Sequence, residues 1–181
     1  MNKHQLITLY SSLIVLTGLL LVVFHTQPIA VVKYTVASSL TVCAVLGFIT
    51  TLKIDKRNVS FIYLNLHSVS ILIYSLALFF ACFSIETFSS FSSVYFIFYS
   101  FSEIIFCFWL FNLKSVVGIK ILIQRLLTGG SVGIGAVILL SNFGNSQTVS
   151  LIGFGILLIL TGINAFFYKP ILQAFETPAS L

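Results

Sequence analysis

Long apolar stretches alternate with short polar connections along the whole chain. Six apolar stretches, at residues 6–24, 34–52, 61–83, 91–113, 121–140 and 149–167, are spread over the 181 residues. Each has roughly the 20 residues that a helix needs to cross a bilayer core about 30 Å thick. A membrane β-barrel would instead alternate apolar and polar residues over about ten positions. The pattern predicts an all-α polytopic membrane protein, a single helical bundle over residues 1–181.

The connections between these stretches are too short to hold an extramembrane domain. They cover residues 25–33, 53–60, 84–90, 114–120 and 141–148, and a short tail follows Tyr168. Any functional site is therefore expected within or between the helices.

Composition excludes two other classes of protein. Charged residues make up 7% of the chain and hydrophobic residues 59%, whereas an ordinary soluble domain is about 25% charged. A soluble enzyme and a disordered chain are both excluded, since disorder requires low hydrophobicity. The three cysteines are far apart and predict apolar packing, so neither a metal site nor a cofactor is expected.

The basic residues predict the orientation in the membrane. If the N-terminus is cytoplasmic, eight of the nine Lys and Arg residues fall on the cytoplasmic side, and only Lys33 falls opposite. The eight are Lys3, Lys53, Lys56, Arg57, Lys114, Lys120, Arg125 and Lys169. Because cytoplasmic loops are enriched in Lys and Arg, six spans with both termini cytoplasmic are predicted, as three antiparallel hairpins. This explains the net charge of +5 without a nucleic-acid partner.

The first and last hairpins share a sequence pattern. Residues 14–21 read IVLTGLLL and residues 158–165 read LILTGINA, with Gly18 and Gly162 in matching positions. In this pattern the chain resembles the HdeD-type family of small bacterial membrane proteins over residues 12–53 and 126–168; the middle hairpin departs from it. The resemblance implies a non-enzymatic protein of the bacterial inner membrane, linked in some members to acid stress.

Glu103 is the candidate functional residue with the clearest physical signal. It lies about ten residues inside the fourth stretch, or roughly 15 Å deep at 1.5 Å per residue. A charge at this depth costs at least about 2.5 kcal/mol, so the side chain should face the bundle interior and have a partner. We expect His67 on the third stretch to be that partner, and desolvation to favour the neutral carboxylic acid.

Helical spacing places both residues on polar stripes. Tyr63, His67, Ser70 and Tyr74 follow one face of the third stretch, and Ser92, Tyr95, Tyr99 and Glu103 follow one face of the fourth. Two interpretations of a seam between these stripes remain open. It could carry protons, with Glu103 as carrier and His67, Tyr63 and Tyr99 beside it, or it could only join the helices through hydrogen bonds.

Small residues of the fifth stretch predict close helix packing, either internal or between subunits. Gly129 and Gly133 form G-x-x-x-G, and Ser131 and Gly135 repeat the spacing. The same segment fits G-x-S-x-G, but a hydrolase nucleophile needs a strand–turn–helix context. Elsewhere, Tyr10, Tyr168 and Trp109 lie toward helix ends, which is typical of interfacial anchors, and Arg125 belongs to a basic segment expected at the inner leaflet.

Three functions remain open. The first is a non-enzymatic membrane protein of the HdeD type, related to acid or other stress. The second is a small proton-coupled transporter or channel that uses Glu103 and His67. The third is a structural subunit of a larger membrane complex. The expected partners are the lipid bilayer and, within it, further copies of the chain or other membrane subunits.

Overall fold

The computed structural model describes residues 2–54, 59–112, 118–141 and 146–176, and these residues are helical apart from short connections. The helices are α1 (Lys3–Val23), α2 (Ile29–Thr51), α3 (Val59–Ala81), α4 (Ile85–Asn112), α5 (Ile119–Ser141), α6 (Gln147–Phe166) and α7 (Tyr168–Glu176). Six helices among the described residues are long and apolar enough to cross a membrane, the sixth span continuing from α6 into α7. The prediction of an all-α membrane protein is confirmed. Three of the orienting residues, Lys56, Arg57 and Lys114, lie outside the described residues.

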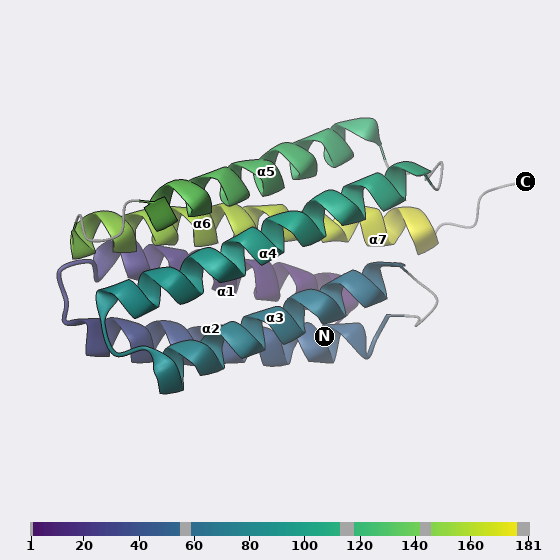
Figure 1. The fold of residues 1–181 in the computed structure, drawn as a ribbon. Helices are drawn as coiled ribbons and strands as arrows, with labels where there is room; N and C mark the ends of the chain where they lie inside the picture. The colour runs from purple at the N-terminus through teal and green to yellow at the C-terminus, as the bar shows by residue number, and fades with distance from the viewer. Residues whose placement is uncertain (1, 55–58, 113–117, 142–145, 177–181) are drawn as a thin grey trace, which may run out of the picture.

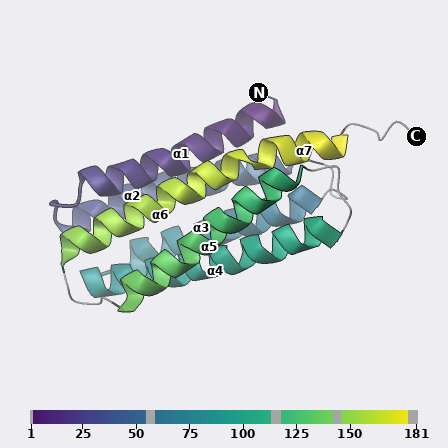
Figure 2. The same cartoon turned by 90° about the horizontal axis from the view of Figure 1, so that it is seen from above.

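The six long helices close into a ring in chain order. Each packs against the next along the chain, and α1 packs along α6 to complete the ring (Figure 1). The most extensive contacts join α1 to α6, α4 to α5 and α2 to α3. The chain begins and the described part of it ends toward the same end of the bundle (Figure 2).

Apolar and aromatic side chains fill the inside of the ring. Phe96 on α4 stacks against Phe154 on α6, with ring centroids 6.1 Å apart and planes within 6°. Tyr10 of α1 and Leu40 of α2 are also fully enclosed, with exposures of 1% and 0%. Outward positions carry exposed Leu, Ile, Val and Phe, as expected where hydrocarbon replaces water around the bundle.

Two helices begin earlier than the apolar pattern predicts. The predicted connection at 84–90 is mostly the first turns of α4, because Ser84 and Thr87 cap it reciprocally: the Ser84 N–H donates to Thr87 Oγ1 at 3.0 Å, and the Thr87 N–H to Ser84 Oγ at 3.3 Å. Helix α2 begins directly after Pro28, which suits the start of a helix because it has no N–H to satisfy. It therefore includes Lys33, which the sequence placed in a connection.

Lys33 is buried rather than solvent-exposed. Its Nζ donates to the carbonyl of Cys82 at 2.6 Å, just beyond the last residue of α3. The ammonium also lies 4.7 Å from the centroid of the Tyr34 ring and 5.2 Å from that of Phe83. A cation at the C-terminal end of a helix is favourable because the helix dipole is negative there. Lys33 thus joins α2 to the end of α3.

Candidate functional site

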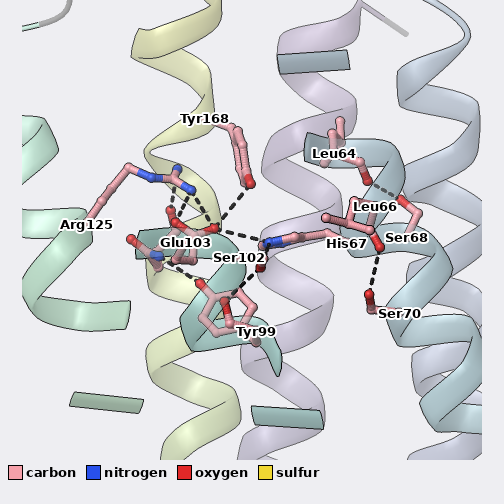
Figure 3. Close-up of polar contacts among 11 residues, drawn as sticks. Leu64, Leu66, His67, Ser68, Ser70, Tyr99, Ser102, Glu103, Arg125 and Tyr168 are labelled. Atoms are coloured by element: carbon pink, nitrogen blue, oxygen red, sulfur yellow. Dashed lines mark hydrogen bonds and ion pairs between the residues drawn. The ribbon is translucent and has the colours of Figure 1, made fainter. Parts of the chain in front are cut away.

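Glu103 lies at the centre of a buried polar cluster that five helices form. Its side chain is 0% exposed. The surrounding polar groups come from α3 (His67), α5 (Arg125) and α7 (Tyr168) (Figure 3). Asn164 of α6 joins them through its contact with Arg125. The predicted inward orientation of Glu103 is therefore found in the structure.

The main partner of Glu103 is Arg125, not the residue that the sequence suggested. Arg125 Nη2 lies 2.7 Å from Glu103 Oε1 and 2.5 Å from Oε2, and both side chains are 0% exposed. The predicted position of Arg125 at the inner leaflet is wrong, because its guanidinium points inward from α5. A guanidinium has only N–H donors, so both oxygens of Glu103 accept from Arg125, in the arrangement typical of a buried ion pair.

His67 is the second partner, and its contacts define which ring nitrogen carries a proton. Its Nε2 lies 3.2 Å from Glu103 Oε1 and 3.3 Å from Ser102 Oγ. The Ser102 hydroxyl already donates to the carbonyl of Tyr99 at 2.8 Å, so it can only accept from His67. A carboxylate is also an acceptor only. Nε2 therefore carries a hydrogen and donates it to both oxygens.

Tyr168, the first residue of α7, supplies the third donor. Its hydroxyl donates to Glu103 Oε1 at 3.2 Å, and its ring lies 4.1 Å from the guanidinium carbon of Arg125. The predicted role of Tyr168 and Tyr10 as interfacial anchors is wrong, since each is 1% exposed. Trp109 differs, with 38% of its side chain exposed.

Tyr99 and Asn164 extend the cluster to α6. The Asn164 side-chain amide donates from Nδ2 to the Tyr99 hydroxyl at 2.7 Å, and the main-chain carbonyl of Asn164 accepts from Arg125 Nη1 at 3.3 Å. The Tyr99 ring also lies 4.9 Å from the His67 ring. These contacts tie α4, α5 and α6 together at one level of the bundle.

The predicted seam between the two polar stripes is formed in part. Tyr74 on α3 and Ser92 on α4 share a hydrogen bond of 2.7 Å, and Tyr74 stacks on Tyr95 with centroids 4.5 Å apart. Ser70 instead donates to the carbonyl of Leu66 in its own helix at 2.8 Å. Tyr63 packs its ring on Phe106 at 4.2 Å. Of the predicted candidates His67 and Tyr99 therefore touch the cluster directly, and Tyr63 lies at its edge.

The serine, imidazole and carboxylate do not form a hydrolytic triad. In a triad the serine and the acid bind opposite nitrogens of the imidazole, so that a proton moves from one side of the ring to the other. Here Ser102 and Glu103 approach the same nitrogen, Nε2. In the part of the chain that the structure describes, no group of three His, Cys, Asp or Glu side chains is placed to hold a metal ion.

The predicted packing residues of α5 face different neighbours. A Cβ on Gly129 would lie 3.0 Å from Glu103 Cβ, and one on Gly133 would lie 2.8 Å from Ser100 Cβ, both on α4. A Cβ on Gly135 would instead meet Leu157 of α6. Gly129 and Gly133 thus let α5 approach α4 beside the cluster. The prediction of internal packing is wrong for Ser131, because its side chain is exposed.

Sequence reasoning missed four members of the cluster: Ser102, Arg125, Asn164 and Tyr168. Arg125 is the seventh residue of α5, about 9 Å from its start at 1.5 Å per residue. This depth is the signal that separates it from Lys120, which lies at the helix end. Asn164 and Tyr168 had no comparable signal, because they lie near the end of an apolar stretch where polar residues are ordinary.

Comparisons of the chain with protein-family models, with curated proteins and with solved structures found no match. The fold and the site define its class without them: a helical integral membrane protein with six spans and a buried ion-pair cluster.

Proposed function

We propose that this protein is a non-enzymatic component of a bacterial inner membrane, and that its Glu103 cluster has a structural role. We call the cluster a clasp, meaning a buried set of polar contacts that holds several helices together. The observation that carries this proposal is the set of donors around the carboxylate. Arg125, Tyr168 and His67 all donate to Glu103, and each comes from a different helix. A carboxylate neutralised by a fixed guanidinium is suited to holding helices together, since releasing it would leave two unpaired charges in the bundle.

Proton transport is the alternative function that a specific contact favours, namely that between His67 and Glu103. For Glu103 to bind a proton, however, it would have to lose its charge beside the guanidinium, which would then be buried without a counter-ion. The clasp explains the same contacts without this cost.

The same proposal includes the arrangement in the membrane. We infer three antiparallel hairpins with both termini in the cytoplasm. Without Arg125, which is used inside the bundle, the cytoplasmic side still holds seven of the other eight Lys and Arg residues. The acid-stress role implied by the resemblance to HdeD-type proteins remains a proposal, as does assembly with further copies of the chain or with other subunits.

A double-mutant cycle on the ion pair tests the clasp. Glu103→Gln and Arg125→Met should each lower the free energy of unfolding by about 3–5 kcal/mol, because each leaves the other charge buried and unpaired. The double variant should lose clearly less than the sum of the two. The measurement is unfolding in mixed micelles with increasing SDS.

Proteoliposomes with an internal pH dye provide the opposing test. The clasp predicts no proton flux from the wild-type protein above that of empty vesicles. A Glu103→Gln variant that is as stable as wild type, together with a wild-type proton flux that this variant lacks, would show that Glu103 is a proton carrier and not a clasp.

A further inference from the structure

The outer face of α5 carries a line of exposed side chains. Helix α5 runs along one edge of the bundle and packs against α4 and α6 (Figure 1). Its buried residues lie on the face toward these helices: Leu122, Arg125, Gly129, Val132 and Ala136. The opposite face carries what we call the outer stripe, the exposed residues Gln124, Leu127, Ser131, Ile134 and Ile138. Their intervals of three and four residues place them on one line, so a single neighbouring helix could touch all of them.

Two members of the outer stripe are polar where hydrocarbon would surround them. Gln124 is the sixth residue of α5 and Ser131 the thirteenth, about 8 Å and 18 Å from its start at 1.5 Å per residue. The main-chain carbonyl of Gln124 accepts from Thr128, but no described residue bonds its side-chain amide or the Ser131 hydroxyl. The outer face of α4, by contrast, exposes apolar side chains such as Phe101 and Ile105. Because an amide without a partner is costly in an apolar medium, the outer stripe favours contact with another membrane helix over contact with lipid.

A second copy of the chain offers these polar groups partners at the right depth. All copies enter the membrane in one orientation, which the excess of Lys and Arg on one side sets, so their α5 helices are parallel. A two-fold axis along the membrane normal then places each outer-stripe residue beside its own counterpart. An amide has both donors and an acceptor, so two Gln124 side chains at one depth complement each other. Lys120 lies at the helix end, where a lysine reaches the head groups.

We propose that the outer stripe of α5 is a two-fold contact with a second copy of this chain, held by reciprocal hydrogen bonds between the two Gln124 amides. This goes beyond the clasp, which acts within one copy, and it names the partner in the assembly proposed above. It rests on the inferred common orientation of the copies. It does not rest on the Glu103–Arg125 pair, which lies on the inward side of α5.

Oxidative cross-linking in membranes tests the contact. In a background with Cys43, Cys82 and Cys107 replaced by alanine, Ser131→Cys places a thiol in the outer stripe with little change in side-chain size. Copper phenanthroline should convert this variant to a disulfide-linked dimer, which requires the two Cα atoms to come within about 7 Å. Ile105→Cys, on the exposed face of α4, is the matched control and should cross-link clearly more slowly.

Native mass spectrometry in mild detergent keeps the test decisive if the cysteine variants fail to fold. With its native cysteines the wild-type protein should be a dimer. Gln124→Leu should raise the dissociation constant about tenfold, the size expected for hydrogen bonds between membrane helices, and Gln124→Asn, which keeps an amide, should raise it less. Ile134→Trp should also weaken the dimer, whereas Ile105→Trp should not, although the two isoleucines are similarly exposed at 66% and 60%.

Three results would each overturn the proposal: a monomeric wild-type protein, equal cross-linking at positions 131 and 105, or cross-linking of position 131 mainly to another protein. A failure of the clasp is distinguishable from all of them. The clasp predicts that Glu103→Gln lowers the free energy of unfolding of the monomer and of the dimer alike, whereas the outer-stripe variants change the dissociation constant.

Discussion

The Glu103 carboxylate is stabilised inside the bundle by donors from three other helices: Arg125, Tyr168 and His67. Only the first of them carries a formal positive charge in every state, since arginine is not deprotonated in proteins. The other two share Oε1 with Arg125, each at 3.2 Å. This division predicts that the three donors contribute unequally to the free energy of unfolding. It also predicts that His67 acts through one N–H and not through its charge.

Two amide substitutions of His67 test this inference. Gln reaches farther than Asn and can place an N–H near the position of Nε2. We expect His67→Asn to lower the free energy of unfolding by about 1.5–3 kcal/mol, as for a lost hydrogen bond to a charged group, and His67→Gln to lower it by clearly less. Thermal unfolding in detergent, followed by circular dichroism, provides the comparison. Equal losses would mean that the Nε2 contact contributes little.

At the level of elements, the contact between α1 and α6 depends on glycines at which the two backbones almost touch. A Cβ on Gly18 would lie 2.6 Å from the carbonyl oxygen of Gly155, and one on Gly162 would lie 2.8 Å from the backbone nitrogen of Val15. Such contacts are the usual means by which membrane helices approach closely. Gly18 and Gly162, which carry the repeated sequence pattern, therefore also have a packing role.

A pair of alanine substitutions tests this packing. Gly18→Ala should lower the free energy of unfolding by about 1–3 kcal/mol, because two of the three nearest obstructing atoms, the Gly155 oxygen and the Ile159 nitrogen, belong to backbone and cannot move away. Gly130→Ala is the control, since nothing lies within 4 Å of its added Cβ, and it should leave stability unchanged or slightly higher. SDS titration of both variants measures the difference. A neutral Gly18→Ala would show that α1 and α6 are packed less closely.

At the level of the whole molecule, the first and last long helices close the ring. The helices that share most contacts, such as α2 and α3, belong to different predicted hairpins. Stability is therefore expected to be distributed around the ring and not to reside in each hairpin separately. The buried cluster lies where four of these helices, α3 to α6, meet α7, so it couples the middle of the chain to its last two helices.

The orientation in the membrane gives a prediction at this scale. In cysteine-free background, Lys169→Cys and a cysteine at position 3 should react with an impermeant maleimide only from the cytoplasmic side, and Gln27→Cys only from the opposite side. The physical reason is the excess of Lys and Arg on the side of the termini. Labelling of positions 3 and 169 from opposite sides would exclude an even number of spans.

Sequence by itself determined the class of the protein and the number of its spans. Twenty-residue apolar runs have few alternatives in a bilayer, because backbone groups must be satisfied within each segment. It also determined that Glu103 faces inward, since the cost of exposing a carboxylate to lipid is large. Helix starts were less certain for two reasons. The apolar pattern takes no account of the local capping contacts between Ser84 and Thr87, and the contact of Lys33 with the Cys82 carbonyl is not local.

Only the tertiary structure decided the partners of Glu103. Arg125 is 22 residues away in the sequence, and a long basic side chain near a helix end can reach either the head groups or the interior. Tyr168 is 65 residues away and lies in α7, beyond the end of α6. Which of several polar side chains meet depends on the rotation and packing of five helices, and no local pattern in the chain encodes that arrangement.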